Sequence, residues 1–266
     1  MTDLILLRHD AGHIATLTLN TPQNLNALSA AMIAALQVQI AALATDASIR
    51  VVILRGAGKV FCAGHDLKEM QAARGNADQG RGYFTRLFND CAAMMQALIA
   101  LPQPVIAAVQ GIATAGGCQL AASCDMIVAA DTARFGVNGV NIGLFCSTPM
   151  VALTRKVPPA VAFEMLTTGE FISAARAREV GLVNRTTSPE ALDHDTRALA
   201  EGLAEGLAAK LASAVRVGKA AFYAQTALSL ADAYAHTGPV MVENILVPDT
   251  DEGITAFLEK RAPNWG

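Results

Sequence analysis

Charged residues are scarce in this sequence, and no stretch of it is strongly basic. They make up 16% of the 266 residues, and the formal net charge is −3 at pH 7. Proteins that bind nucleic acids usually present a basic face or segment to the phosphate backbone. We therefore expect no nucleic-acid partner.

Uninterrupted apolar runs of membrane-spanning length are also absent. A transmembrane helix needs about 18 or more consecutive apolar residues. The two best candidate stretches are interrupted, 28–44 by two glutamines and 91–109 by two prolines. The sequence is nevertheless apolar, with 53% hydrophobic residues and a mean hydropathy of +0.36. We therefore expect no membrane span, and we expect the additional apolar surface to be buried between subunits.

The cysteines and histidines do not form a disulfide or metal pattern. The five cysteines are an odd number without the spacing of a disulfide framework. The first ten residues also lack the pattern of a secretory signal, so we expect reduced thiols and a cytoplasmic location. His9 and His13 are four residues apart, but Gly12 between them predicts a turn, which is unsuited to a zinc pair on a helix. We expect no metal site.

The pattern of apolar residues changes near residue 188. Before this point, short β-like runs alternate with helical segments, which is typical of an α/β protein. Turns or loops are predicted at 10–12 and 72–82, strands at 4–9, 13–20, 50–55, 105–109 and 126–129, and helices at 29–44 and 83–100. After residue 188 the sequence is rich in alanine and leucine, with helical segments over 190–228 and near 254–261. The sequence thus predicts an α/β core over 1–188 and a helical region over 189–266.

Two turns that contain glycine are the most informative segments, Phe61–Leu67 and Ala113–Leu120. Each is predicted to connect a buried strand to a helix, and the first amides of a helix have no partner inside it. Two such turns that face each other can hold one carbonyl oxygen between two N–H groups, as an oxyanion hole does. The first turn alone does not decide for this function, because turns of this kind are common. Neither a dinucleotide fingerprint nor a phosphate loop fits the glycines at 56–58.

The order of motifs along the chain resembles the crotonase superfamily, also called the enoyl-CoA hydratase/isomerase family. The motifs lie at 25–28, 104–111, 116–118, 124–125, 135–136, 168–170, 181–183 and 252–257. With the distinctive segment 139–149, they are similar to the branch typified by enoyl-CoA hydratase domain-containing protein 3. The resemblance covers nearly the whole chain. It implies a ClpP-like spiral of ββα units with a C-terminal helical trimerisation region, and assembly into trimers or hexamers.

The resemblance also implies roles for individual positions. The amides of His65 and Gly116 would hold the thioester oxygen of an acyl-CoA and stabilise an enolate-like charge. Coenzyme A is then part of the substrate, and no separate cofactor is implied. Other positions expected to contact the substrate are Leu25, Ala27, Ala63, Asp66, Leu67, Gly117, Asn138 and Leu144, with Phe257 and Lys260 near the nucleotide.

Two positions depart from the hydratase pattern. Hydratases of this family hold the attacking water between two glutamates, and Gln119 and Gly139 stand at those positions here. Neither side chain transfers a proton near pH 7. Gly139 also counts against the single-glutamate isomerases, and Asn141 replaces the additional aspartate of the dienoyl isomerases. The naphthoate-synthase branch shares the glycine, but it has an aspartate where Cys146 stands.

The sequence therefore predicts an acyl-CoA-binding protein of fatty-acid metabolism, nominally an enoyl-CoA hydratase and thus a lyase, that hydrates poorly. The ring of His65 is a weaker candidate for a substitute catalytic group, because the role that the resemblance implies for this residue is that of its backbone amide. The thiols of Cys118 and Cys146 are also weaker candidates, because buried thiols are usually structural. One alternative is another acyl-CoA reaction, such as thioester hydrolysis or decarboxylation. The other is a non-catalytic acyl-CoA-binding or regulatory protein. A carboxylate entering the pocket would favour an enzyme, and an apolar pocket floor would favour binding alone.

Overall fold

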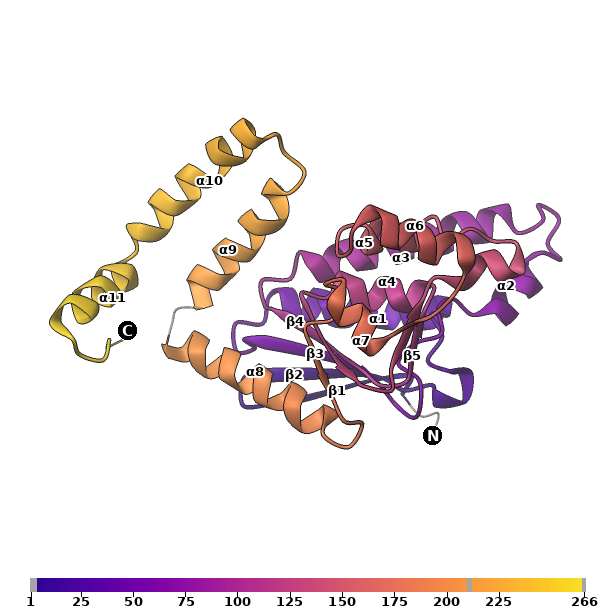
Figure 1. Ribbon diagram of the computed structural model, residues 1–266, viewed down its shortest axis with the longest axis horizontal. Coiled ribbons are helices and arrows are strands. Elements are labelled where there is room, and N and C mark those ends of the chain that lie inside the picture. Colours follow the sequence, from indigo (N-terminus) through magenta and orange to yellow (C-terminus); the bar gives the residue numbers. More distant parts are fainter. Residues whose placement is uncertain (1–3, 210–211, 265–266) are drawn as a thin grey trace.

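The computed structural model describes residues 4–209 and 212–264, and it has the α/β fold predicted for this chain. A six-stranded sheet and a three-stranded sheet form its framework (Figure 1). The strands are β1 (Leu6–Ala11), β2 (Ile14–Leu19), β3 (Val51–Gly56), β4 (Val105–Val109), β5 (Ile112–Thr114), β6 (Met126–Ala130), β7 (Arg134–Gly136), β8 (Ile172–Ser173) and β9 (Arg185–Thr187). The larger sheet has the order β1-β2-β3-β4-β6-β9, and the smaller has the order β5-β7-β8.

Helices cover both faces of the larger sheet. Those before residue 188 are α1 (Ala30–Ala44), α2 (Leu67–Ala73), α3 (Arg81–Ile99), α4 (Gly116–Ser123), α5 (Pro149–Leu153), α6 (Pro159–Thr168) and α7 (Ala174–Glu179), with 3₁₀ turns η1 (Pro22–Asn24) and η2 (Asn138–Ile142). The later helices are α8 (Leu192–Ala209), α9 (Ala212–Gln225), α10 (Leu230–Ile245) and α11 (Pro248–Glu259). In Figure 1, α3 and α4 lie above the strands and α8 lies below them.

The first two strands form a hairpin whose turn lies further along the chain than predicted. The prediction placed the turn at 10–12, but Ala11 is still paired with Ile14. The turn residues are Gly12 and His13, with φ values of 57° and 62°. Two consecutive positive φ values define the type I′ turn, whose twist matches that of the flanking strands. The pattern of glycine and aspartate located the hairpin, and strand pairing decided its register.

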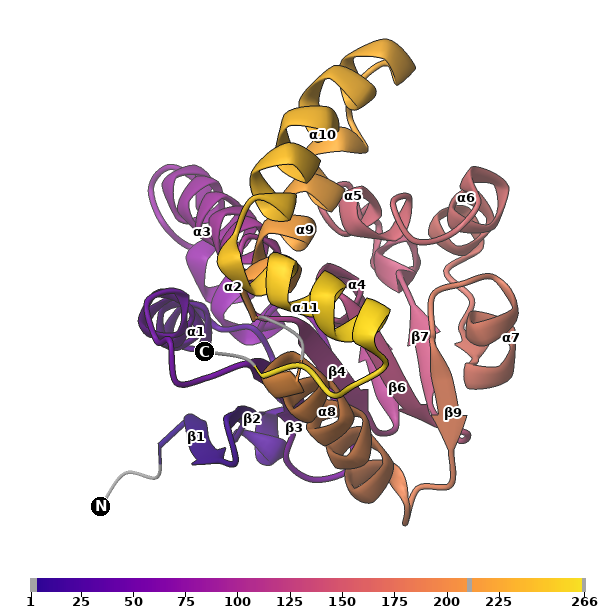
Figure 2. The ribbon, with the colours of Figure 1, turned by 90° about the vertical axis from the view of Figure 1, so that its left-hand side faces the viewer.

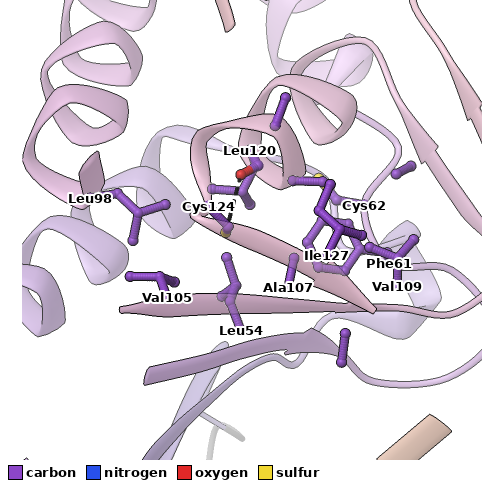
Figure 3. Close-up of a cluster of buried hydrophobic side chains, with 14 of the residues drawn as sticks. Leu54, Phe61, Cys62, Leu98, Val105, Ala107, Val109, Leu120, Cys124 and Ile127 are labelled. Carbon is purple, nitrogen blue, oxygen red and sulfur yellow. Dashed lines mark hydrogen bonds between the residues drawn. The ribbon is translucent and has the colours of Figure 1, made fainter. Parts of the chain in front are cut away.

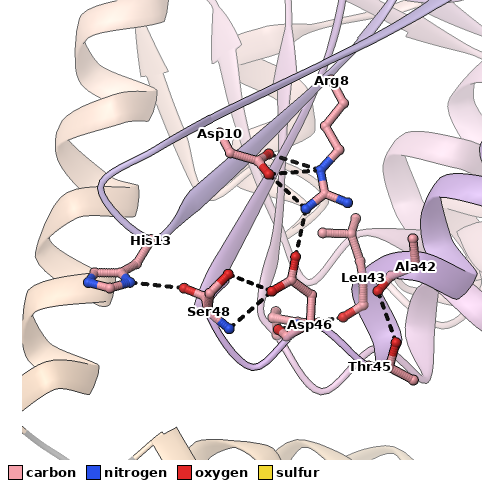
Figure 4. A network of polar contacts seen from close by, with 9 residues as sticks. Arg8, Asp10, His13, Ala42, Leu43, Thr45, Asp46 and Ser48 are labelled. Carbon is pink, nitrogen blue, oxygen red and sulfur yellow. Dashed lines mark hydrogen bonds and ion pairs between the residues drawn. The ribbon is translucent and has the colours of Figure 1, made fainter.

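A network of polar contacts joins β1 to the segment that follows α1. The guanidinium of Arg8 lies 2.8 Å from the carboxylates of both Asp10 and Asp46 (Figure 4). Hydrogen bonds from the hydroxyl of Ser48 and from Arg8 lower the pKa of Asp46. Nδ1 of His13 lies 2.9 Å from the carbonyl oxygen of Ser48, so this histidine takes part in the hairpin's attachment.

The central strands are buried on both faces, as the nearly continuous apolar sequence of 51–54 predicts. Every residue of β4 is buried. Figure 3 shows Leu54 and Val105 from this sheet among the side chains of Leu98 on α3 and Leu120 on α4. β2, β3, β4 and β6 run parallel to one another, so their carboxyl ends lie at one edge of the sheet. The core therefore fixes the place where the glycine-containing turns leave the sheet.

Side-chain caps fix the beginnings of two helices close to these turns. As predicted, α1 begins after Ser29, whose hydroxyl accepts a hydrogen bond from the amide of Met32. α2 begins after Asp66, whose carboxylate accepts from the amides of Lys68 and Glu69. A cap of this kind satisfies amides that have no partner within the helix. Asp66 is thus engaged in the helix start.

The chain after residue 188 is helical, as predicted, and its helices lie in two different places. α8 packs against β2, β3, β4 and β6, whereas α9, α10 and α11 extend away from the sheets (Figures 1 and 2). No residue of α10 is buried. Within residues 4–209 and 212–264, no helix combines the length and the apolar character needed to cross a bilayer. The division of the chain at residue 188 stays a prediction.

Candidate active site

The structure places the two glycine-containing turns side by side. The amide of Cys62 donates to the carbonyl oxygen of Ile112 at 3.2 Å, and the amide of Thr114 donates to the carbonyl oxygen of Cys62 at 3.1 Å. Gly64 has a φ of +90°, and a Cβ at this position would lie 3.1 Å from the amide nitrogen of Gly116. Glycine at position 64 thus allows both the backbone conformation and the close approach of the two turns.

The amides of His65 and Gly116 have no hydrogen-bond acceptor among the residues that the structure describes. Gly116 is the first residue of α4, so its N–H group has no partner inside the helix. The aligned peptide dipoles of the helix add partial positive charge at this end. Both residues line one cavity. Two unpaired N–H groups at one cavity are the arrangement that an oxyanion hole needs.

The turn before α4 depends on Ala115, which sequence analysis did not single out. Its φ of 49° and ψ of −119° are values that residues other than glycine rarely adopt. Its amide donates to the carbonyl oxygen of Gly136 at 2.9 Å, which ties the turn to β7. Strained backbone of this kind is found mostly at functional sites. No sequence signal could have shown it, because alanine favours the ordinary helical conformation.

A cavity of about 350 Å³ lies where the two turns meet. Its walls are formed by residues of α2 and α3, by the turn before α4 and by the segment from η2 to the start of α5. The lining residues are Ala63, His65, Leu67, Met70, Phe88, Thr114, Ala115, Gly116, Asn138, Gly139, Asn141, Ile142, Leu144, Phe145, Cys146, Ser147, Thr148 and Pro149. No carboxylate, ammonium or guanidinium group belongs to this set of described residues. The polar groups that line the cavity are therefore hydroxyls, amides, a thiol and one imidazole.

The imidazole ring of His65 is largely buried against Phe88. The two rings are in edge-to-face contact, with 5.4 Å between their centroids. Nε2 is buried and has no hydrogen-bond partner among the described residues. Burial lowers the pKa of His65 to about 4, because the charged form loses its solvation. The ring is thus neutral at physiological pH and is a weak base.

The two residues that stand where the hydratases have glutamates, Gln119 and Gly139, lie in very different places. Gln119 is only 5% exposed and is not among the cavity-lining residues, and its Oε1 has no partner in the described part of the chain. Gly139 does line the cavity. A Cβ at this position would lie 2.3 Å from the carbonyl oxygen of Leu144 and 2.8 Å from Sγ of Cys146. The backbone therefore leaves no room for a side chain at position 139.

The remaining polar groups of the cavity are mostly engaged with the protein. The hydroxyl of Thr114 donates to Oδ1 of Asn138 at 2.6 Å, which leaves the amide N–H₂ of Asn138 available to a ligand. The amide nitrogen of Asn141 donates to the carbonyl oxygen of Gly169 at 3.4 Å. Cys146 is buried, and burial raises the pKa of its thiol. Its thiolate form is thus disfavoured, as expected for a structural cysteine.

The family resemblance implies further substrate contacts, and the structure brings only some of them to the cavity. Ala63 and Leu67 line it, together with Asn138 and Leu144. Four others do not line it. Asp66 caps α2, Leu25 is half exposed at a positive φ, Ala27 is buried, and Gly117 packs against the carbonyl oxygen of Cys62. Met70 and Phe88 also form a wall of the cavity, which the sequence did not indicate. Their helical spacing gave no signal that distinguishes a cavity wall from the core.

Phe257 and Lys260, expected near the nucleotide, lie elsewhere in a single chain. Phe257 is on α11 and is 82% exposed, and Lys260 follows the end of the same helix. α11 and α2 lie at opposite ends of the molecule (Figure 1). Their contact with a nucleotide stays a prediction.

Within 4–209 and 212–264, no group of three or more histidine, cysteine, aspartate or glutamate residues is arranged to hold a metal ion. The expectation of a site without metal or separate cofactor stays a prediction.

Comparison with known proteins gives consistent matches over the whole chain. The model of the family described as enoyl-CoA hydratase/isomerase matches residues 9–266. A Xenopus laevis protein named "Enoyl-CoA hydratase domain-containing protein 3, mitochondrial" is 47% identical over 264 residues, which are 99% of this chain and 86% of the relative. The human protein of the same name is 44% identical over 256 residues, with 95% of this chain and 80% of the relative covered. Since these relatives are named mitochondrial, a cytoplasmic location for this chain stays a prediction.

Solved structures show the same fold. A crystal structure of an enoyl-CoA hydratase from Mycobacterium smegmatis has a TM-score of 0.92 and 51% identity, and 99% of each chain is covered. The crystal structure of human enoyl-CoA hydratase domain-containing protein 3 has a TM-score of 0.91 and 43% identity, with 98% of this chain and 100% of that chain covered. The fold expected from the order of motifs is therefore confirmed.

Proposed function

Since the chain belongs to the enoyl-CoA hydratase/isomerase family, we propose that it binds an acyl-CoA thioester in the cavity between the two glycine-containing turns. The carbonyl oxygen of the thioester would accept hydrogen bonds from the amides of His65 and Gly116. The observation that carries this proposal is that both amides lack an acceptor in the described chain and belong to residues lining one cavity. The close approach at Gly64 and the strained backbone of Ala115 support it.

Two N–H donors at the carbonyl oxygen stabilise negative charge that develops there. A thioester gains this charge when it becomes an enolate, either through loss of a group from the α-carbon or through attack at the β-carbon of an enoyl group. The donors belong to a backbone held by the core, so they need no rearrangement during the reaction. Each donor of this kind typically contributes about 10²- to 10³-fold in rate.

The rest of the cavity suits an uncharged acyl group. Met70, Phe88 and Leu144 form apolar walls, and the described lining contains no ionic side chain. Burial of one methylene group contributes about 0.8 kcal/mol. Affinity should therefore increase with acyl length until the cavity of about 350 Å³ is filled.

Efficient hydration is not part of this proposal. Gln119 lies outside the cavity lining, Gly139 offers no side chain, and no carboxylate lines the described cavity. Addition of water requires a positioned acid and base. The same observation favours a second candidate function, acyl-CoA binding without turnover. Decarboxylation and thioester hydrolysis are the alternative reactions, and decarboxylation needs no protein base for bond cleavage, since the electrons pass into the enolate.

Assembly of several copies is part of the proposed function. The C-terminal helices expose large apolar side chains, including Tyr234, Met241, Leu246 and Phe257. An apolar surface of this kind usually contacts a partner. We expect trimers, alone or paired as hexamers, in which Phe257 and Lys260 of one copy reach the nucleotide bound to a neighbour.

A comparison of two substitutions at one position tests the proposal. Gly116→Ala and Gly116→Pro both add a Cβ, which would lie 3.2 Å from Nδ1 of His65, but only proline removes the N–H group. Proline is accepted at the first position of a helix. Titration calorimetry with crotonyl-, octenoyl-, 3-hydroxybutyryl- and malonyl-CoA should show thioester binding for the wild type and the alanine variant, and weaker binding for the proline variant.

Mass spectrometry of the same mixtures separates the candidate functions. A hydrated, hydrolysed or decarboxylated product identifies the reaction, and tight binding without any product supports the second candidate. Absence of acyl-CoA binding by the folded wild type, or equal binding by a folded Gly116→Pro variant, would contradict the proposal.

A further inference from the structure

One side-chain amide on the wall of the proposed acyl-CoA cavity has no part in the oxyanion hole. Nδ2 of Asn138 forms no hydrogen bond within residues 4–209 and 212–264. It is not among the fully buried atoms that lack a partner, so it is open to the cavity that Asn138 lines. Its N–H groups can donate but not accept. The cavity therefore offers a bound acyl group a donor in addition to the amides of His65 and Gly116.

The hydroxyl of Thr114 decides which end of the Asn138 amide faces the cavity. Thr114 is only 8% exposed, and its Oγ1 donates to Oδ1 of Asn138 at 2.6 Å. This hydroxyl forms no other hydrogen bond in the described part of the chain. A reversed amide would leave its proton without an acceptor, and buried polar groups nearly always have a partner. The contact therefore holds Oδ1 at Thr114 and directs Nδ2 towards a ligand.

Strand pairing holds Asn138 next to the oxyanion hole. β5 and β7 are parallel, with Thr114 opposite Gly136, and the amide of Ala115 donates to the carbonyl oxygen of Gly136 at 2.9 Å. Gly116 follows Thr114 by two residues, and Asn138 follows Gly136 by two residues, so both lie beyond the same end of this strand pair. When a thioester oxygen occupies the oxyanion hole, the first carbons of the acyl group are therefore the ones nearest to Asn138.

The apolar walls of the cavity make this donor selective. Met70, Phe88 and Leu144 would exclude water once an acyl group is bound. A saturated acyl group would then remove water from Nδ2 of Asn138 and offer no acceptor in return, which weakens binding. Sites with such a donor discriminate strongly against a ligand that lacks the matching oxygen. The described lining has no cationic side chain to balance a carboxylate, so the matching oxygen should be uncharged.

We propose that the acyl group carries a second, uncharged carbonyl oxygen close to the thioester, as a 3-oxoacyl group does, and that Asn138 donates a hydrogen bond to it. This inference rests on the proposed function, because it requires the first carbonyl oxygen to lie in the oxyanion hole. A carbonyl oxygen only accepts, which matches a group that only donates. Asn138 is then a specificity-determining residue, and Thr114, which acts through it, is a positioning residue.

Titration calorimetry of the full chain with butyryl-CoA and 3-oxobutyryl-CoA tests this inference. The two esters have the same chain length and differ by the oxygen on the third carbon. The wild type should bind the 3-oxo ester about ten- to a hundredfold more tightly, the usual effect of pairing a donor that is otherwise left without an acceptor. Asn138→Leu, which is similar in size, should bind both esters alike. Thr114→Val frees the amide to rotate and should reduce the preference about three- to tenfold.

Asn138→Asp tests the direction of the hydrogen bond. Its carboxylate can only accept, so this variant should still bind 3-hydroxybutyryl-CoA, whose hydroxyl donates, and should lose the preference for the 3-oxo ester over butyryl-CoA. Asn76→Asp, in the exposed loop after α2, makes the same exchange away from the cavity and should bind all three esters like the wild type.

The saturated ester separates failure of this inference from failure of the proposed function. If the folded wild type does not bind butyryl-CoA or the 3-oxo ester, acyl-CoA binding itself is wrong. If butyryl-CoA binds and its affinity falls in Gly116→Pro, but the wild type shows no preference for the 3-oxo ester, only the role of Asn138 is wrong. A preference that persists in Asn138→Leu, in a variant that still binds butyryl-CoA, would also overturn that role.

Discussion

Replacing Asp125 by alanine should strongly destabilise the attachment of the C-terminal helices. Oδ2 of Asp125 accepts hydrogen bonds from Nζ of Lys219 at 2.7 Å and from the amide of Val105 at 2.6 Å. Oδ1 accepts from the hydroxyl of Tyr223 at 2.8 Å. The side chains of Asp125 and Lys219 are 16% and 8% exposed. One carboxylate therefore joins α9 to the beginning of β4.

The magnitude follows from what the substitution leaves behind. The ammonium of Lys219 would keep only the carbonyl oxygen of Gln103, at 2.8 Å, as an acceptor. Removing one partner of a buried ion pair typically costs about 3–5 kcal/mol, because the other charge stays buried. We therefore expect the free energy of unfolding to fall by about 4 kcal/mol. Asp125→Asn keeps the size of the side chain and one oxygen acceptor, and it should cost about 1–3 kcal/mol.

Urea unfolding monitored by circular dichroism at one fixed protein concentration measures these differences. The double variant Asp125→Ala with Lys219→Met should be more stable than Asp125→Ala alone, because it leaves no buried charge without a partner. Tyr223→Phe removes a single hydroxyl and serves as the small-effect control. A loss of less than about 1 kcal/mol for Asp125→Ala, or a double variant that shows only the sum of the single effects, would refute the buried-charge argument.

Four other outcomes are expected. The wild type should hydrate crotonyl-CoA about 10⁴- to 10⁸-fold more slowly than a relative with both glutamates, since two acid/base groups contribute about 10²- to 10⁴-fold each. The loss of enoyl-thioester absorbance measures the hydration rate. A rate comparable to that of the relative would show that another group activates water. Gly116→Pro should lose any turnover that Gly116→Ala retains, as followed by product mass spectrometry. The pKa of His65 is lowered to about 4, so the unfolded chain binds more protons than the folded chain between about pH 6.5 and 4. The free energy of unfolding should therefore fall by about 3 kcal/mol as the pH falls through this range. The urea unfolding midpoint of the His65→Leu variant should lack this pH dependence. Gly139→Ala should lower the free energy of unfolding by about 1–3 kcal/mol, because its Cβ would lie 2.3 Å from the carbonyl oxygen of Leu144. An unchanged free energy in urea unfolding would mean that the loop that carries Leu144 moves freely.

The sequence alone was sufficient for the elements that local patterns determine. The continuous apolar run at 105–109 coincides with β4, and Ser29 begins α1 as expected. These features depend on neighbouring residues, through side-chain periodicity and a cap within one turn of the helix. The order of motifs gave the family in the same way, because short segments such as 116–118 keep their spacing along the chain.

Only the tertiary structure decided which of the expected site residues meet at one cavity. Gln119 and Gly139 were both expected there, but Gln119 does not line the cavity, and position 139 is closed by the carbonyl oxygen of Leu144. A glutamate at position 139 would therefore require movement of the loop that carries Leu144. Ala115 holds its unusual conformation because β7 and the first turn surround it. Each of these outcomes depends on contacts between segments far apart in the sequence, and close packing of a shared core, rather than any local pattern, sets those contacts.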